Sequence, residues 1–83
     1  MKYHAKIEVS LKPGHSNPEG ETTARLLKEL GYKVAAVDVS KNYTVNLEAS
    51  TVSEAKAKAE EMSKRLLANP TKDNFTVTVE EQK

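Results

Sequence analysis

The first twelve residues alternate between apolar and polar side chains, and this pattern constrains the fold of the chain more than any other. Every odd position from 3 to 11 is apolar, and every even position from 2 to 12 is polar or charged. A period of two places successive side chains on opposite faces of a β-strand. The pattern therefore predicts a strand with one buried and one hydrated face. It ends at Pro13, because proline has no N–H group to donate to a neighbouring strand.

A helix is predicted to follow over residues 18–30. Asn17 suits the N-cap, and Pro18 costs nothing at the first helical position, where the backbone N–H has no partner within the helix. Gly31 can end the helix in the left-handed conformation. Side chains at helical spacing form its predicted buried stripe: Thr23, Leu26, Leu27 and Leu30.

Two further strands, residues 34–39 and 43–49, are predicted to form a hairpin. Their apolar side chains recur with the period of a strand. Only Ser40, Lys41 and Asn42 separate them, and asparagine tolerates positive φ better than most residues. The connection is therefore short enough for a tight turn.

A second helix and a last strand complete the chain. Thr51 and Glu54 have capping-box spacing, and Pro70 ends the helix because the residue before proline avoids the helical region. Residues 74–80 alternate again and predict a strand. The predicted apolar stripe of the helix consists of Val52, Ala55, Ala59, Met62 and Leu66. Ion pairs at i and i+4 are predicted for Glu54 with Lys58, Glu60 with Lys64, and Glu61 with Arg65.

The predicted fold class is α+β, with a ferredoxin-like β-α-β-β-α-β order. One domain over residues 1–83 would form an antiparallel sheet with both helices on one face. The opposite, polar face would be open to water or to another subunit. A domain of this size buries only about 60 to 65% of its unfolded surface, so its stability margin is small. The chain has no cysteine, which leaves partner subunits as the common way to stabilise it.

Composition excludes several classes of function. A net charge of +1 predicts no nucleic-acid partner, because such proteins concentrate Lys and Arg on one face. No apolar stretch is long enough to span a membrane, and no apolar secretion segment follows the N-terminus. We therefore expect a cytoplasmic protein.

No constellation of catalytic or metal-binding residues is recognisable. His4 lies on the polar parity of the first strand, and His15 lies in the following loop. Glu60 and Glu61 point about 100° apart on a helix, so they do not converge. The turn at Gly14, next to a helix N-terminus, has two interpretations, a simple turn or an anion site. We expect no catalytic residue, bound cofactor or metal.

Two activities of ferredoxin-like domains are also disfavoured. An RNA-binding sheet needs outward aromatic side chains, whereas Tyr3, Tyr43 and Phe75 have the inward parity. An acylphosphatase-like site needs an arginine in the loop after the first strand. The only arginines here, Arg25 and Arg65, lie on predicted helices.

Four short motifs resemble the PurS subunits of formylglycinamidine ribonucleotide synthase. The motifs are Leu11-Lys12-Pro13-Gly14, Asn17-Pro18-Glu19-Gly20-Glu21-Thr22, Leu30-Gly31-Tyr32 and Leu66-Leu67-Ala68-Asn69-Pro70. The resemblance extends from Lys12 to Phe75. It departs at Asp38 and Ser40, where the family often has arginine and glycine, at Thr71, where an apolar residue is usual, and at Phe75, where tyrosine is usual.

The resemblance implies a non-catalytic subunit of a three-part complex in purine synthesis. A glutaminase would release ammonia, and a large synthase would use ATP to form the amidine, with Mg, ATP and glutamine bound by the complex rather than by this chain. The resemblance also implies a homodimer with exchanged segments, or a tetramer. We expect two loops to contact the larger subunits, through Lys12, Pro13, Gly14, Asn17, Pro18, Asn69 and Pro70.

The alternative from another class is a free-standing regulatory domain. Such a domain would bind an amino acid or a nucleotide at a dimer interface, and the ligand would raise its melting temperature in isolation. An independent small enzyme ranks third.

Overall fold

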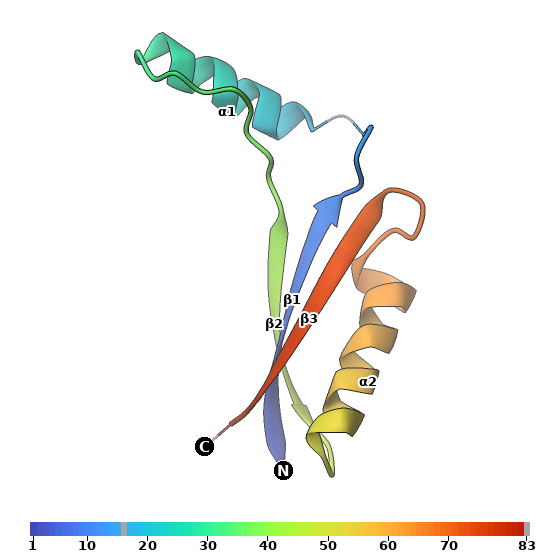
Figure 1. Cartoon of the computed structure of the whole chain (residues 1–83). Helices are drawn as coiled ribbons and strands as arrows, with labels where there is room; N and C mark the ends of the chain where they lie inside the picture. Colours follow the sequence, from blue (N-terminus) through green and yellow to red (C-terminus); the bar gives the residue numbers. More distant parts are fainter. Residues whose placement is uncertain (16, 83) are drawn as a thin grey trace.

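The computed structural model describes residues 1–15 and 17–82, and it contains an antiparallel sheet with one helix packed on it (Figure 1). The elements are β1 (Lys2–Leu11), α1 (Pro18–Glu29), β2 (Lys41–Glu48), α2 (Val52–Met62), a π-helical turn η1 (Ser63–Leu67) and β3 (Asp73–Glu81). The strand order is β2-β1-β3, and both neighbours of β1 are antiparallel to it. The predicted α+β class and the antiparallel sheet are confirmed.

The core lies between the sheet and α2. The apolar residues of β1 from Tyr3 to Val9 are buried as predicted, whereas Leu11 is half-buried. Ile7, opposite Tyr43 and Val77, is completely buried. Ala55 and Ala59 of α2 are also completely buried. Because alanine side chains are short, α2 can lie close to the sheet. The helix contacts β3 and β1 more than β2, and the apolar side chains of both outer strands, β2 and β3, are half-buried.

The predicted capping box starts α2. Thr51 Oγ1 accepts a hydrogen bond from the Glu54 N–H at 3.1 Å, and Glu54 Oε2 accepts one from the Ser50 N–H at 3.3 Å. Glu54 Oε1 also lies 3.0 Å from Lys58 Nζ. The hydrogen bond from Lys58 is the largest cause that holds the pKa of Glu54 below its usual value, and the hydrogen bond from the Ser50 N–H is the next largest.

Replacing Glu54 by glutamine is expected to remove a pH-dependent contribution to stability. Because the folded-state pKa lies below the unfolded value of 4.5, the carboxylate stabilises the folded chain above that pH. The contribution is lost as the pH falls through the folded-state pKa. In urea unfolding, the wild type should exceed Glu54→Gln in stability by more at pH 7 than at pH 3. Glu60→Gln is the control for the substitution itself, because Glu60 forms no ion pair within the described residues of the same helix. An equal difference for Glu54→Gln would contradict the prediction.

The C-terminal end of α2 differs from the prediction. The helix passes into η1, where the Ala68 N–H donates to the Ser63 carbonyl at 2.8 Å, and the buried Ser63 hydroxyl donates to the Ala59 carbonyl at 2.8 Å. Because a π-helical turn is wider than an α-helical one, the apolar stripe loses its register there. Leu66, predicted to be buried, is 83% exposed. The Glu61 pair with Arg65 is confirmed at 3.1 Å, whereas the described residues form no pair between Glu60 and Lys64.

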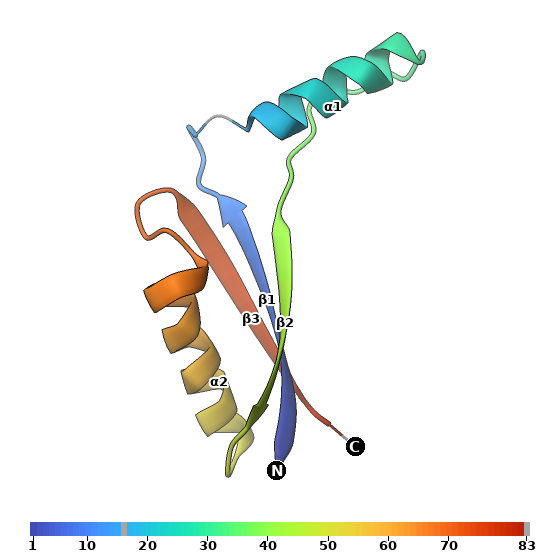
Figure 2. The same ribbon diagram turned by 180° about the vertical axis from the view of Figure 1, so that it is seen from behind.

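The predicted hairpin is wrong for the single chain. Residues 34–39 form no strand, and the chain enters β2 without turning back. No described residue other than glycine has positive φ, so Asn42 does not supply a turn conformation. Instead, this segment leads away from the end of the sheet to α1 (Figures 1 and 2). We call residues 17–40, which comprise α1 and this segment, the arm.

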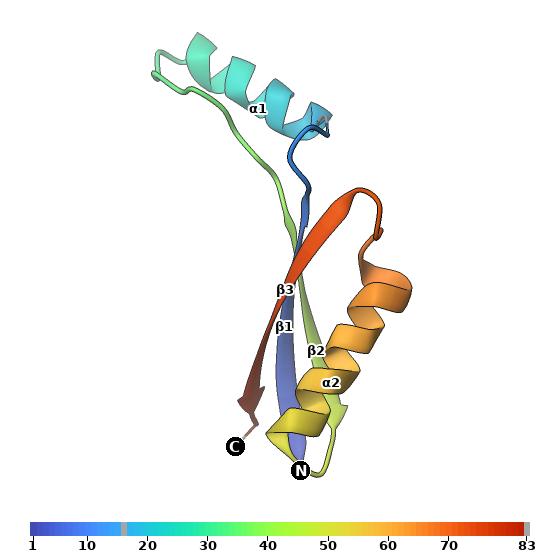
Figure 3. The same ribbon diagram turned by 45° about the vertical axis from the view of Figure 1, so that its right-hand side comes forward.

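The prediction of both helices on one face is also wrong for the single chain. Figure 3 shows α2 against the sheet and α1 beyond the end of the sheet. Within α1 only Gly20 and Ala24 are buried, whereas Leu26 is 49% exposed and Leu30 is 75% exposed. The described residues therefore cover the apolar stripe of α1 only in part, since Thr23 and Leu27 are half-buried and Leu26 and Leu30 are exposed.

Candidate docking surface at the end of the sheet

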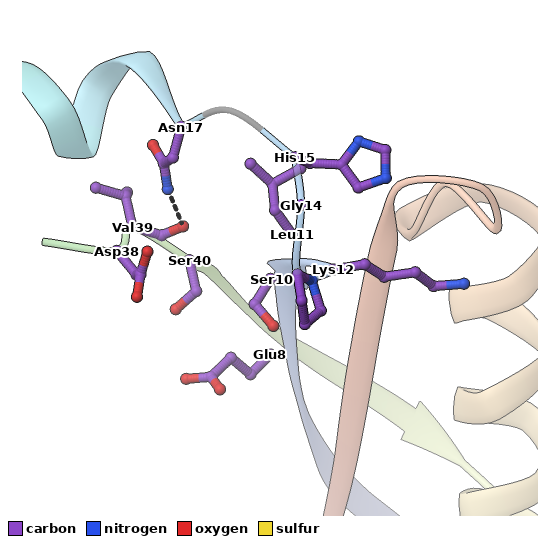
Figure 4. A pocket seen from close by; sticks show the side chains of 11 residues that line it. Glu8, Ser10, Leu11, Lys12, Gly14, His15, Asn17, Asp38, Val39 and Ser40 are labelled. Carbon is purple, nitrogen blue, oxygen red and sulfur yellow. Dashed lines mark hydrogen bonds between the residues drawn. The ribbon is translucent and has the colours of Figure 1, made fainter. Parts of the chain in front are cut away.

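The two loops predicted to contact other subunits meet at one end of the sheet. The Lys12 N–H donates to the Lys72 carbonyl at 2.6 Å, and Lys12 Nζ donates to the Pro70 carbonyl at 2.9 Å. In Figure 4 the Lys12 side chain extends from the end of β1 towards the chain that leads into β3. The structure therefore brings Lys12, Asn69 and Pro70 into one surface, with Pro13 and Gly14 directly beside them.

The turn before β3 is held by its own polar side chains. Asn69 Oδ1 accepts hydrogen bonds from the N–H groups of Thr71 at 2.9 Å and Lys72 at 3.3 Å. Asp73 Oδ2 accepts one from the Asn69 N–H at 2.8 Å. Pro70 and the Thr71 side chain are exposed. Asn69 thus shapes the turn, while Pro70 and Thr71 present its outer surface.

Asn17 links the start of α1 to the part of the arm that leads into β2. Its Oδ1 accepts from the Gly20 N–H at 3.0 Å, which confirms the predicted cap, and Pro18 occupies the first turn. Asn17 Nδ2 donates to the Val39 carbonyl at 3.3 Å (Figure 4). Asn17 and Pro18 therefore belong to the base of the arm, whereas Lys12 and Pro70 belong to the end of the sheet.

The loop between these two groups makes a turn at Gly14. Its φ is +90°, a conformation that other residues rarely adopt, and the His15 N–H donates to the Lys12 carbonyl at 3.3 Å. Ser16 lies outside the described residues. The geometry fits the turn interpretation of Gly14, and the anion interpretation stays a prediction.

A hollow of about 520 Å³ lies between this loop and the base of the arm (Figure 4). Glu8, Lys12, Asn17, Asp38 and Ser40 are among its lining residues. Two of the departures from the resembled family, Asp38 and Ser40, therefore face this hollow. Among residues 1–15 and 17–82, no group of three His, Asp or Glu side chains is placed to hold a metal ion.

The sequence interpretation missed the close contact at Gly20. A Cβ atom at this position would lie 2.1 Å from the Val37 carbonyl oxygen. An isolated glycine within a helical pattern is the signal that could have revealed such an approach. Gly20 and the Asn17 bond together hold α1 against the segment that leads to β2.

None of the helices that the structure describes has the length and apolar character needed to cross a membrane.

Comparisons with known proteins extend over nearly the whole chain. The PurS family model, described as phosphoribosylformylglycinamidine (FGAM) synthase, matches residues 4–81. The PurS subunit of phosphoribosylformylglycinamidine synthase from Methanocaldococcus jannaschii is 38% identical over 79 residues, covering 94% of this chain and 95% of the relative. The PurS structure from Thermus thermophilus has a TM-score of 0.91 at 32% identity, covering 100% of both chains. A chain of the PurLQS structure from Thermotoga maritima has a TM-score of 0.88 at 25% identity, covering 96% of this chain and 99% of that one. The chain therefore belongs to the PurS family of phosphoribosylformylglycinamidine synthase subunits.

Proposed function

We propose that this chain is the non-catalytic small subunit of phosphoribosylformylglycinamidine synthase in purine biosynthesis in the cytoplasm. It bridges the glutaminase and the ATP-dependent synthase and supports the transfer of ammonia between them. Formylglycinamide ribonucleotide is then converted to the amidine on the large subunit, which binds ATP and Mg, while the glutaminase binds glutamine. The similarity to a chain of the Thermotoga maritima PurLQS structure over 96% of this chain carries the proposal.

The end of the sheet is the proposed docking surface for the larger subunits. Its turn is exposed at Pro70 and Thr71 and is fixed by the hydrogen bonds of Asn69 and by the Lys12 bond to Pro70. A surface that is already ordered loses little conformational entropy when it binds, which favours docking. A docking subunit needs such a surface rather than an acid, a base or a metal.

The proposed subunit is a homodimer that exchanges its arms. Among the described residues the outer edge of β2 has no neighbouring strand, and residues 34–39 belong to no helix or strand. Such an edge is a template for a strand from another chain. Residues 34–39 of one copy would pair with β2 of the other copy. The α1 helix of the first copy would then lie beside α2 of the other copy, on the side of the sheet that carries the odd-numbered residues, which we call the core face.

The core face has room for this helix. α2 lies mainly over β1 and β3, and the β2 side chains Tyr43, Val45 and Leu47 are half-buried. Leu26 and Leu30 of the other copy's α1 supply the apolar stripe that would cover them. The exchange would then assemble the predicted four strands and two helices from two chains.

The bridging function is tested by reconstituting activity from the purified glutaminase, the synthase and this chain. We expect glutamine-dependent synthesis to require the chain and ammonia-dependent synthesis not to require it. Glutamine-dependent synthesis at full rate without the chain would contradict the proposal. A ligand-dependent rise in the melting temperature of the isolated chain would then favour the regulatory alternative.

Adding a large side chain to the docking surface should impair this activity. Thr71→Arg is expected to lower glutamine-dependent synthesis at least tenfold and leave ammonia-dependent synthesis unchanged, because the arginine blocks contact at the exposed turn. Ser53→Arg is the control, since it adds the same side chain to the exposed side of α2. Equal activity of both variants and the wild type would remove the turn from the docking surface without affecting the bridging function.

A further inference from the structure

The outer edge of β3 carries backbone groups that face away from the rest of the sheet. β3 pairs with β1, and no other strand of the described residues lies beside it. The Gln82 N–H donates to the Lys2 carbonyl at 2.8 Å, so the even-numbered residues of the two strands form the hydrogen-bonded pairs. Neighbouring residues of an antiparallel strand point their N–H and C=O groups in opposite directions. The backbone groups that point outward therefore belong to Phe75, Val77, Val79 and Glu81.

β3 lacks the features that usually keep an edge strand from pairing. Proteins block strand addition with lysine, proline or a β-bulge at such an edge. The residues of β3 include no lysine, arginine or proline, and the unbroken one-to-one register from Tyr3 to Leu11 contains no bulge. In Figures 1 and 3 the C-terminal end of β3 lies on the side away from α2. The arm exchange leaves this edge free as well, because it uses the edge of β2 on the other side of the sheet.

We propose that an extended segment of one of the larger subunits adds to the sheet as a strand along the outer edge of β3. The inference rests on the proposed bridging function, since it names the contact by which the chain would be held. The edge continues the docking surface, because β3 begins directly after the turn at which Pro70 and Thr71 are exposed. The bond from the Asn69 N–H to Asp73 Oδ2 at 2.8 Å ties this turn to the strand. A segment that contacts the turn can therefore continue along β3, where backbone hydrogen bonds supply affinity.

The side chains of β3 indicate the chemistry of the added segment. Phe75, Val77 and Val79 are half-buried on the core face, so apolar side chains of a neighbouring strand can pack beside them. Glu80 and Glu81 are exposed at the C-terminal end, and neither forms an ion pair among the residues that the structure describes. The edge therefore fits a segment that alternates apolar and polar residues and carries lysine or arginine beside Glu80 and Glu81.

A second copy of this chain fits the edge less well than such a segment. Antiparallel pairing of two β3 strands about Val77 would place Glu81 of each copy opposite Asp73 of the other. Like charges directly opposite each other destabilise a strand pair. The charges of β3 thus favour a basic partner over a second acidic strand.

Amide hydrogen exchange of the nitrogen-15-labelled chain tests the strand addition residue by residue. The chain, alone and saturated with the purified glutaminase and synthase, is exposed to heavy water and transferred to dimethyl sulfoxide, where NMR measures the remaining amide protons. In the chain alone, the N–H groups of Phe75, Val77 and Val79 should exchange about tenfold faster or more than those of Thr76 and Thr78, which are bonded to β1. In the complex, the outward groups should slow by about a hundredfold or more, so the alternation disappears.

The outcomes separate the strand addition from the bridging function. Alternating exchange that persists in an active complex would overturn the strand addition and leave the bridging function intact. Failure of the larger subunits to bind the chain would overturn both. Slow exchange of the outward N–H groups in the chain alone would overturn the strand addition, because a second copy would then occupy the edge.

Reversing one charge tests the basic character of the segment. Glu81→Lys should raise the dissociation constant for the larger subunits by about tenfold or more, because an ammonium group would then face the basic residues. Glu61→Lys is the control, since it makes the same charge change at an exposed position of α2, and its dissociation constant should stay within about threefold of the wild type. Equal binding by both variants would overturn the proposal of a basic segment at this end of β3.

Discussion

Alanine in place of Gly20 is expected to destabilise this protein, although the same change stabilises most helices. At an ordinary helical position, replacing glycine by alanine gains about 0.5 to 1 kcal/mol. Here the new Cβ atom would lie 2.1 Å from the Val37 carbonyl oxygen, and a backbone atom cannot turn aside as a flexible side chain can. The helix must move away from the segment before β2, which also disrupts the hydrogen bond from Asn17 to Val39.

Overpacking of this kind costs about 1 to 3 kcal/mol. The free energy of unfolding, measured in urea at a fixed protein concentration, should fall by this amount in Gly20→Ala. Thr22→Ala is the matched control, because Thr22 is exposed on the same helix and alanine improves helix propensity there. The control should be as stable as the wild type or more stable. A gain in stability for Gly20→Ala would show that α1 does not need its contact with Val37.

The elements that were predicted correctly are those specified by neighbouring residues. The alternation around Ile7 sets which side of β1 is buried, and the caps at Asn17 and Thr51 need only the backbone N–H three residues away. Gly31 adopts positive φ because the end of a helix favours it there. Each of these features depends on contacts within a few residues, and a sequence pattern contains that information.

The position of α1 was not predictable in the same way. The stripe of Leu26 and Leu30 indicates that this side of the helix needs an apolar partner, but it does not indicate which chain supplies the partner. A connection at Ser40 that turns back within one chain and a connection that continues towards a second copy would bury the same side chains. Local sequence patterns therefore do not distinguish the two. The exposure of Leu66 depends on a π-helical turn fixed by the buried Ser63, and apolar spacing alone does not reveal such a turn.

The candidate docking surface was also predictable only as far as its local turns. The motifs around Lys12 and Asn69 were recognisable as turns, because proline, glycine and asparagine have specific roles in them. Their meeting at one end of the sheet follows from the antiparallel pairing of Leu11 with Asp73. The role of Asn17 as a link to Val39 required coordinates, since these residues are 22 positions apart.

Glycine in place of Asn42 is expected to convert the proposed exchanged dimer into monomers. Pairing Val39 with Tyr43 in one chain would keep both side chains on the core side and would require a three-residue loop at positions 40–42. Such loops place their last residue in the left-handed region, usually as glycine. The left-handed conformation costs a residue other than glycine about 1 to 2 kcal/mol, and asparagine lies at the low end of this range, so the substitution still favours the closed hairpin.

The dimer contains two such connections, and a gain of about 1 kcal/mol at each corresponds to a rise of about thirtyfold in the dimer dissociation constant. Sedimentation equilibrium of the wild type and of Asn42→Gly measures this change. Asn46→Gly is the control, because it makes the same substitution in the interior of β2, where glycine weakens the strand without forming a turn. If both variants shift the dissociation constant equally, the connection at Ser40 is not the hinge. In that case residues 34–39 do not exchange by the opening of a hairpin.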